Sequence, residues 1–163
     1  MTLKHRVLVV EDDESFCQLI STVLVRAGYG TAVVCDGLAA LDALESYKPD
    51  VIFLDMRLPL LDGWGFLQKY RDLPGLHKPI IASSAGNVDR TSLGDVIEFF
   101  PKPFNIKSFL TVLESVILKT MDGAFDYRIN IFKMHGATLI FWCNRGNCDC
   151  YGGANTHLAF EMN

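Results

Sequence analysis

Short apolar runs alternate with amphipathic stretches along most of the chain. Three of the runs, 7–10, 51–54 and 80–82, are uninterrupted and rich in Val and Ile. Such runs are typical of strands that are buried on both faces of a parallel sheet. Two further runs, 31–34 and 96–100, predict two more strands, so the pattern indicates five strands in all.

Stretches with apolar residues at helical spacing separate these strands. The spacing is clearest over 105–119, and shorter amphipathic stretches follow the first three strands. Strands that alternate with helices of this length favour a parallel sheet with helices on both faces. The interval between Ser84 and Lys102 is short, so we expect little room for a helix between the fourth and fifth strands.

Residues 121–163 have a different character, because they sustain no helical period and contain a loop rich in Gly, Asn and Cys. Three alternatives stay open for this segment: a β-rich extension, a terminus that is disordered or non-native, and a zinc site. The zinc ligands would be Cys143, Cys148, Cys150 and His157. The cysteine spacing matches none of the common paired-cysteine zinc patterns.

Composition narrows the class of protein. Half of the 163 residues are hydrophobic and 21% are charged, which is typical of one packed domain with a modest appendage. The net charge is −4 and no run of Lys and Arg occurs, so we expect no nucleic-acid partner. The apolar run near the N-terminus is too short for a signal peptide or a membrane span. We therefore expect a cytoplasmic protein without a membrane partner.

The five cysteines change this picture little. Cys17 and Cys35 fall within predicted core elements, and we interpret both as small buried hydrophobic residues.

Polar residues lie within two positions of the end of four predicted strands. Glu11 and Asp12 follow the first strand, Asp55 the third, Ser84 the fourth and Lys102 the fifth. In open α/β sheets the carboxyl ends of the strands form the edge that binds ligands. Carboxylates that meet there repel one another until a hard divalent cation joins them. The sequence therefore predicts a site with acids, a hydroxyl and one ammonium.

These motifs resemble the receiver domain of two-component response regulators. Within that family they are most similar to single-domain regulators of the chemotaxis type. The resemblance covers 6–119, and we take 4–120 as the receiver domain and 121–163 as a C-terminal extension. It implies a doubly wound five-stranded parallel sheet with strand order 2-1-3-4-5, the flavodoxin-like receiver fold. It is carried by Val-Val-Glu11-Asp12-Asp13, Leu-Asp55-Met-Arg-Leu-Pro59 with Asp62-Gly63, Ser84-Ala85 and Lys102-Pro103-Phe104.

The resemblance implies a phosphorelay function. Asp55 would be the phospho-acceptor, which takes a phosphoryl group from a histidine kinase or a phosphotransfer protein. Mg²⁺ would be held by Asp12, Asp55 and the backbone carbonyl of Arg57, with Glu11 acting through water. A change in protein contacts would then carry the signal to a downstream protein target.

The resemblance also assigns residues to the response. Lys102 would pair with the phosphoryl oxygens, and the Ser84 hydroxyl would turn inward with the switch aromatic Phe99. We interpret Asp13 as a helix N-cap or a solvated residue rather than a ligand. We expect Ser83 to satisfy local hydrogen bonds of the sheet rather than to bind phosphate.

Two other functions stay open. One is a degenerate receiver that binds proteins independently of phosphorylation. The other is a Mg²⁺-dependent phosphatase with an aspartate nucleophile, but such enzymes have a second aspartate two residues after the first, where this chain has Arg57. Otherwise we expect no enzyme, with at most slow self-catalysed phosphorylation and dephosphorylation.

Overall fold

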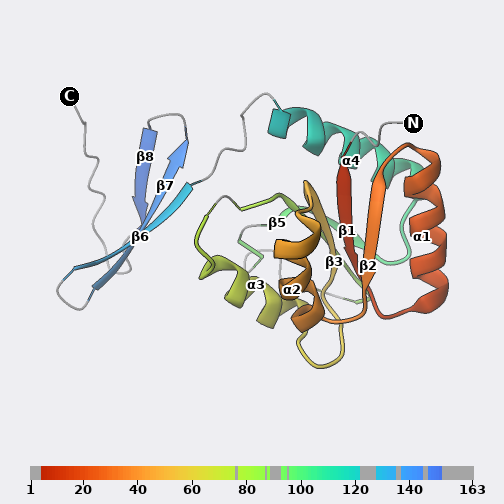
Figure 1. The fold of residues 1–163 in the computed structure, drawn as a ribbon, viewed down its shortest axis with the longest axis horizontal. Coiled ribbons are helices and arrows are strands. Elements are labelled where there is room, and N and C mark those ends of the chain that lie inside the picture. The colour runs from red at the N-terminus through yellow and green to blue at the C-terminus, as the bar shows by residue number, and fades with distance from the viewer. Residues whose placement is uncertain are drawn as a thin grey trace. The chain divides into compact units, whose positions relative to one another are not determined.

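The computed structural model describes residues 5–75, 77–86, 88, 93–94 and 96–121, together with the strand residues 128–134, 137–144 and 147–151. The chain divides into two compact units (Figure 1). The first unit comprises Met1–Asp72 and Lys78–Leu118, and the second comprises Leu73–His77 and Lys119–Asn163. Each unit is considered by itself.

The first unit is built on one parallel sheet. Its strands are β1 (Arg6–Val10), β2 (Gly30–Val34), β3 (Val51–Asp55), β4 (Ile80–Ser84) and β5 (Val96–Pro101). Its helices are α1 (Glu14–Arg26), α2 (Gly37–Tyr47), α3 (Gly63–Arg71) and α4, which runs from Ile106 to Met121. The strands pair in parallel in the order β2-β1-β3-β4-β5. The five-stranded, doubly wound sheet predicted from the sequence is thus confirmed.

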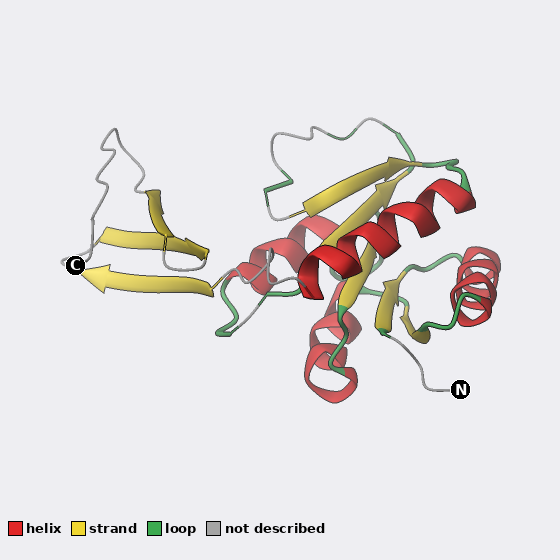
Figure 2. Cartoon of the chain, turned by 90° about the horizontal axis from the view of Figure 1, so that it is seen from above, coloured by secondary structure: helices red, strands yellow, loops and turns green. Residues whose placement is uncertain are grey.

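Two apolar clusters cover the two faces of this sheet, and helices lie on both sides of the strands (Figure 2). Alternate strand residues supply the two clusters, since successive side chains of a strand point to opposite faces. Leu8, Ile52 and Leu54 belong to the cluster that contains residues of α2 and α3. Val9 and Phe53 belong to the cluster that contains residues of α1 and α4. Because β1 and β3 are buried on both faces, their carboxyl ends are held rigidly.

Aspartates begin three of the helices. Asp13, Asp36 and Asp62 are the N-caps of α1, α2 and α3, and each side chain accepts a hydrogen bond from a backbone N–H of the first turn. This bond satisfies a donor that the helix itself leaves unpaired. The interpretation of Asp13 as a helix N-cap is confirmed, and the carboxylate is thereby engaged outside the predicted metal site.

Between β4 and β5 the structure describes residues 85, 86, 88, 93 and 94, and none of these is helical. Leu93 is buried in the same cluster as residues of α2 and α3. The Arg71 guanidinium donates to the carbonyl oxygen of Leu93 at 3.5 Å and lies against Gly94. The connection is therefore anchored to α3 by one apolar side chain and one arginine.

One of the two cysteine interpretations is wrong. Cys35 is exposed, because it lies one residue beyond the end of β2 and so outside the sheet. Cys17 is half-buried, and its thiol donates to the carbonyl oxygen of Glu11 at 3.3 Å. Burial, followed by the charge of Glu11, raises the pKa of the Cys17 thiol to about 11.

The second unit contains an antiparallel sheet of three strands in the order β6-β7-β8. Its strands are β6 (Arg128–Met134), β7 (Ala137–Asn144) and β8 (Asn147–Tyr151). The described part of the C-terminal extension is therefore β-structured, which is one of the alternatives left open by the sequence. The proposed zinc ligands fall outside the described residues: His157 entirely, and Cys143, Cys148 and Cys150 in their side chains. Among the described helices, none has the length and apolar content that crossing a membrane requires.

Candidate functional site

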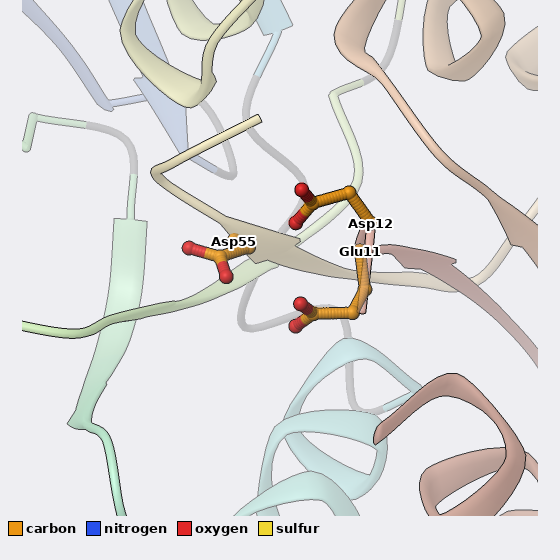
Figure 3. Close-up of side chains that lie close together, drawn as sticks. All are labelled: Glu11, Asp12 and Asp55. Carbon is orange, nitrogen blue, oxygen red and sulfur yellow. The ribbon is translucent and has the colours of Figure 1, made fainter. Parts of the chain in front are cut away.

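Three carboxylates meet at the carboxyl ends of β1 and β3. The two strands are neighbours, with Val10 paired to Leu54, so the residues that follow Val10 lie beside Asp55. Ligand oxygens of Glu11, Asp12 and Asp55 all lie within 4.8 Å of one another. Figure 3 shows the carboxylates of Glu11 and Asp12 directed toward the side on which Asp55 lies. The structure thus brings together the three acids that the sequence placed in one site.

Lys102 joins two of these carboxylates. Its ammonium donates to Glu11 Oε2 and to Asp55 Oδ2, both at 2.5 Å. Lys102 follows the end of β5. Its backbone N–H donates to the carbonyl oxygen of Ser84, at the end of β4, at 2.8 Å, and this hydrogen bond fixes its position. Burial lowers the pKa of Lys102, but the hydrogen bonds to Asp55 and Glu11 outweigh burial and raise the pKa overall. Lys102 is therefore a fixed positive charge at the centre of the site.

Asp55 is held by a partner on each carboxylate oxygen. Oδ1 accepts from the backbone N–H of Arg57 at 2.9 Å, and Oδ2 accepts from Lys102. The residue is only 5% exposed, so a reactant can reach it only through a narrow opening. Glu11 is more deeply buried, and burial raises its pKa against the opposing effect of the hydrogen bond from Lys102. The site thus places two buried carboxylates in contact with one ammonium, and these contacts restrict the reorientation of both acids.

The donor set fits a hard divalent cation. Three carboxylates with one ammonium leave two negative charges without a compensating group, and carboxylate oxygens are the ligands that Mg²⁺ prefers. Asp12 is exposed, so one side of the cluster is open to the water molecules that Mg²⁺ usually retains. Glu11, Asp12 and Asp55 could therefore hold such an ion.

The residues at the end of β4 are buried. The Ser84 hydroxyl makes only a long contact of 3.5 Å, to the carbonyl oxygen of Ala85. The Ser83 hydroxyl is also buried and has no hydrogen-bond partner among the described residues, so the expectation that Ser83 satisfies local hydrogen bonds is wrong for its side chain. The physical reason is that Ser83 lies within the paired part of β4, where the backbone groups of the sheet bond to one another. Phe99 is paired with Ala82 and is 8% exposed, so its ring already lies inside.

Arg57 reaches from the end of β3 toward the end of β4. A Cβ atom placed on Gly86 would lie 2.8 Å from Nη2 of Arg57, so the guanidinium occupies the space that a side chain at this position would fill. Gly86 has φ of 104°, a left-handed conformation that favours glycine. The glycine and the arginine side chain therefore lie against each other, two residues beyond Ser84 and Asp55 respectively.

Two consecutive leucines after β3 have opposite environments. The Leu61 side chain fills the space between Gly37 and Gly65, where added Cβ atoms would lie 3.1 Å from Cγ and 2.4 Å from Cδ1 of Leu61 respectively. The Leu61 carbonyl oxygen also accepts from the N–H of Gly37 at 3.0 Å. Leu60 has φ of 60° and is 85% exposed. A left-handed conformation costs a residue with a side chain about 1–2 kcal/mol.

Sequence reasoning missed Phe16. The Lys102 ammonium lies over the Phe16 ring, 4.7 Å from its centroid, which is a favourable cation–π distance. The ring also packs against Phe53 and Phe104. In the sequence Phe16 marks only the apolar face of an amphipathic helix. No signal there could have linked it to a lysine that follows a strand far along the chain.

Comparison with known protein families identifies the family of this chain. The model of the response regulator receiver domain matches residues 7–114. This chain belongs to the response regulator receiver domain family. The match lies within the range 6–119 over which the sequence motifs resemble a receiver domain. Receiver domains are signalling modules of two-component systems.

Two curated relatives are about twice as long as the matched region. A probable transcriptional regulator of Guillardia theta, ycf27, is 31% identical over 76% of this chain and 49% of its own length. The DNA-binding response regulator MtrA of Mycobacterium bovis is 30% identical over 74% of this chain and 54% of its own length. The chain spans about half the length of these relatives, so the similarity concerns their receiver part.

Two solved receiver domains have the same fold. The receiver domain of Francisella response regulator 1452 is 29% identical with a TM-score of 0.66, covering 72% of this chain and 99% of that chain. The receiver domain of a sensor histidine kinase from Pseudomonas aeruginosa PAO1 is 30% identical with a TM-score of 0.63, covering 69% and 97%. The latter structure has a magnesium ion coordinated in its active site cleft.

Proposed function

We propose that this receiver domain accepts a phosphoryl group on Asp55 from a histidine kinase or a phosphotransfer protein. The observation that carries the proposal is the convergence of Glu11, Asp12, Asp55 and Lys102 on one opening at the carboxyl edge of the sheet. Phosphoryl transfer requires mainly positioning and charge compensation, which this arrangement supplies.

The reaction forms one bond and breaks one bond. A carboxylate oxygen of Asp55 attacks phosphorus, the bond from phosphorus to the donor histidine nitrogen breaks, and an acyl phosphate results. Lys102 already lies on Oδ2 of Asp55, so its ammonium is within reach of the phosphoryl oxygens that arrive there. Glu11, Asp12 and Asp55, with the backbone carbonyl of Arg57, would hold Mg²⁺, which supplies charge compensation for the transferring group.

The response to phosphorylation involves the ends of β4 and β5. The long Ser84 contact leaves its hydroxyl available to donate to a phosphoryl oxygen. Phe99 is paired across the sheet with Ala82, two residues before Ser84, so a shift of the Ser84 backbone reaches the aromatic ring. Because the ring is already buried, the proposed switch would tighten its packing rather than bring it in from solvent.

The proposed partners are a phosphohistidine-bearing protein and a downstream protein target. The names of the two curated relatives concern DNA binding or transcription, and this chain matches about half of each. The absence of a nucleic-acid partner therefore stays a prediction for this chain, as does the absence of enzyme activity beyond slow self-catalysed turnover of the phosphoryl group.

Intact mass spectrometry tests the proposal. Wild-type protein incubated with acetyl phosphate and Mg²⁺ should gain the mass of one phosphoryl group, and omission of Mg²⁺ should prevent the gain. If the protein never gains this mass from any donor, and binds its partners equally well with and without a phosphoryl donor, it would instead be a degenerate receiver. Sustained release of phosphate from added phosphomonoesters would favour the phosphatase alternative.

We expect Arg57→Ala to shorten the lifetime of the phosphorylated protein severalfold. The guanidinium lies beside Gly86, two residues beyond Ser84, and in the proposed function it restricts the approach of water to the phosphoryl group. Loss of the phosphoryl group is followed by intact mass after the donor is removed. Arg26→Ala, which removes an exposed arginine from the far end of α1, is the matched control. An unchanged or longer lifetime for Arg57→Ala would mean that the arginine does not shield the site.

We propose residue 120 as the end of the receiver domain, and removal of 122–163 should leave phosphoryl uptake intact. Among the described side chains, the buried residues of both apolar clusters lie between Val7 and Ile117. The shortened protein keeps all of α4 and should show a cooperative thermal transition by circular dichroism. A shortened protein that fails to fold would place essential packing within the extension.

A further inference from the structure

The loop between β3 and α3 presents an apolar side chain where stability would favour another residue. Leu60 is 85% exposed and has a left-handed backbone, so it gains little from burial and tolerates its conformation poorly. Gly and Asn adopt this conformation most readily. Leucine at this position therefore requires an explanation other than the stability of the isolated fold.

Two more exposed apolar residues lie around the same junction. Leu38 and Trp64 are 48% and 36% exposed, at the starts of α2 and α3. Their chain neighbours Gly37 and Gly65 both contact Leu61, which follows Leu60. Leu38, Leu60 and Trp64 are thus held around one partly buried leucine, and we call these three residues the junction patch. In Figure 1 the loop that contains Leu60 projects at the bottom of the view, below α2.

The junction patch lies close to the proposed phospho-acceptor. Gly63 donates to the carbonyl oxygen of Met56 at 3.2 Å, and a Cβ atom on Gly63 would lie 2.8 Å from the carbonyl oxygen of Asp55. Leu60 is three residues from Gly63, and three residues span at most about 11 Å. A stable protein interface covers about 800 Å² of each partner, which corresponds to a disc of radius about 16 Å. A protein donor centred on Asp55 would therefore cover Leu60.

We infer that the junction patch is a docking surface for the protein that delivers phosphohistidine to Asp55. The inference rests on the proposed function and adds the partner surface to it. Exposed acids, Asp12, Asp13 and Asp62, also lie at this edge of the sheet. The donor that fits is a protein with an apolar contact near its phosphohistidine and basic side chains around it. Leu60, at the tip of the loop, is the central apolar contact.

The test compares two phosphoryl donors in the full chain. One is phosphoramidate, which has a phosphorus–nitrogen bond but no protein surface, and the other is an autophosphorylated histidine kinase that phosphorylates the wild type. Leu60→Asn removes the apolar contact but suits the left-handed backbone. The matched control is Leu118→Asn, which removes an exposed leucine about 18 Å along α4 from Ile106, the start of that helix.

Leu60→Asn should slow transfer from the kinase about tenfold, as expected for the loss of a central apolar contact. Its transfer from phosphoramidate and its melting temperature should match or exceed those of the wild type. Leu118→Asn should behave as the wild type with both donors.

Three results would overturn the inference. Transfer from the kinase to Leu60→Asn at the wild-type rate would remove the docking role. A marked fall in the melting temperature of Leu60→Asn would make Leu60 a structural residue. A wild-type dimer that Leu60→Asn converts to monomer in sedimentation would assign the patch to a second copy of the chain. If the wild type gained no phosphoryl group from either donor, the proposed function itself would fail.

Discussion

We expect an Asp55→Asn variant to take up no phosphoryl group under conditions in which the wild-type protein should take up one. The amide is a poor nucleophile, Glu11 is buried and paired with Lys102, and Asp12 is engaged as a Mg²⁺ ligand in the proposed function. The shape of the side chain hardly changes, and the amide oxygen can still accept from the N–H of Arg57. The fold should therefore survive, and the loss should concern the chemistry alone.

Intact mass after incubation with acetyl phosphate and Mg²⁺ measures this loss. Asp42→Asn, an exposed aspartate on α2, is the matched control and should be phosphorylated as the wild type. Full phosphorylation of Asp55→Asn would move the acceptor to another residue and leave the receiver assignment as a statement about the fold only.

We expect an Asp12→Asn variant to bind Mg²⁺ at least about tenfold more weakly than the wild type. Loss of a residue that merely orients a metal ligand typically costs about 10-fold to 100-fold in metal affinity, so loss of a charged ligand should cost no less. Asp12 is the exposed member of the cluster, and its substitution leaves the buried pair of Glu11 and Lys102 intact. Phosphoryl uptake should fall with Mg²⁺ affinity, and higher Mg²⁺ concentration should restore part of it.

Calorimetric titration with Mg²⁺ measures this affinity directly. Asp13→Asn is the matched control, because it removes one neighbouring charge while Asn still caps α1. Equal weakening in both variants would mean that general negative charge attracts the ion and that Asp12 is no ligand.

The two variants also separate the competing functions. A degenerate receiver would show neither phosphoryl uptake nor a dependence on Asp55. A phosphatase would lose turnover in Asp55→Asn, yet the wild type would release phosphate repeatedly rather than retain one group. The proposed function requires one group, on one residue, with a measurable lifetime.

Local sequence was sufficient for the elements of the receiver fold. The run 51–54 predicts β3, which spans Val51–Asp55, because a short continuous apolar run bounded by turn residues is typical of a strand buried on both faces. Residues 105–119 predict α4, which spans Ile106–Met121, because apolar spacing of three and four residues forms one face of a helix. The site acids were predictable as well, since they lie at the carboxyl ends of two predicted strands.

The sequence by itself determined the elements and which polar residues follow each strand, because these depend on neighbours within a few positions. Only the tertiary structure decided the contacts between distant segments. Lys102 bridges Glu11 and Asp55 above the ring of Phe16. Of the adjacent leucines, Leu60 is exposed whereas Leu61 is partly buried against the core. Ser83 and Ser84 likewise differ in their hydroxyl contacts although they are neighbours on one strand. Such differences depend on which distant residues pack against each side chain, and the spacing of residues along the sequence does not determine these contacts.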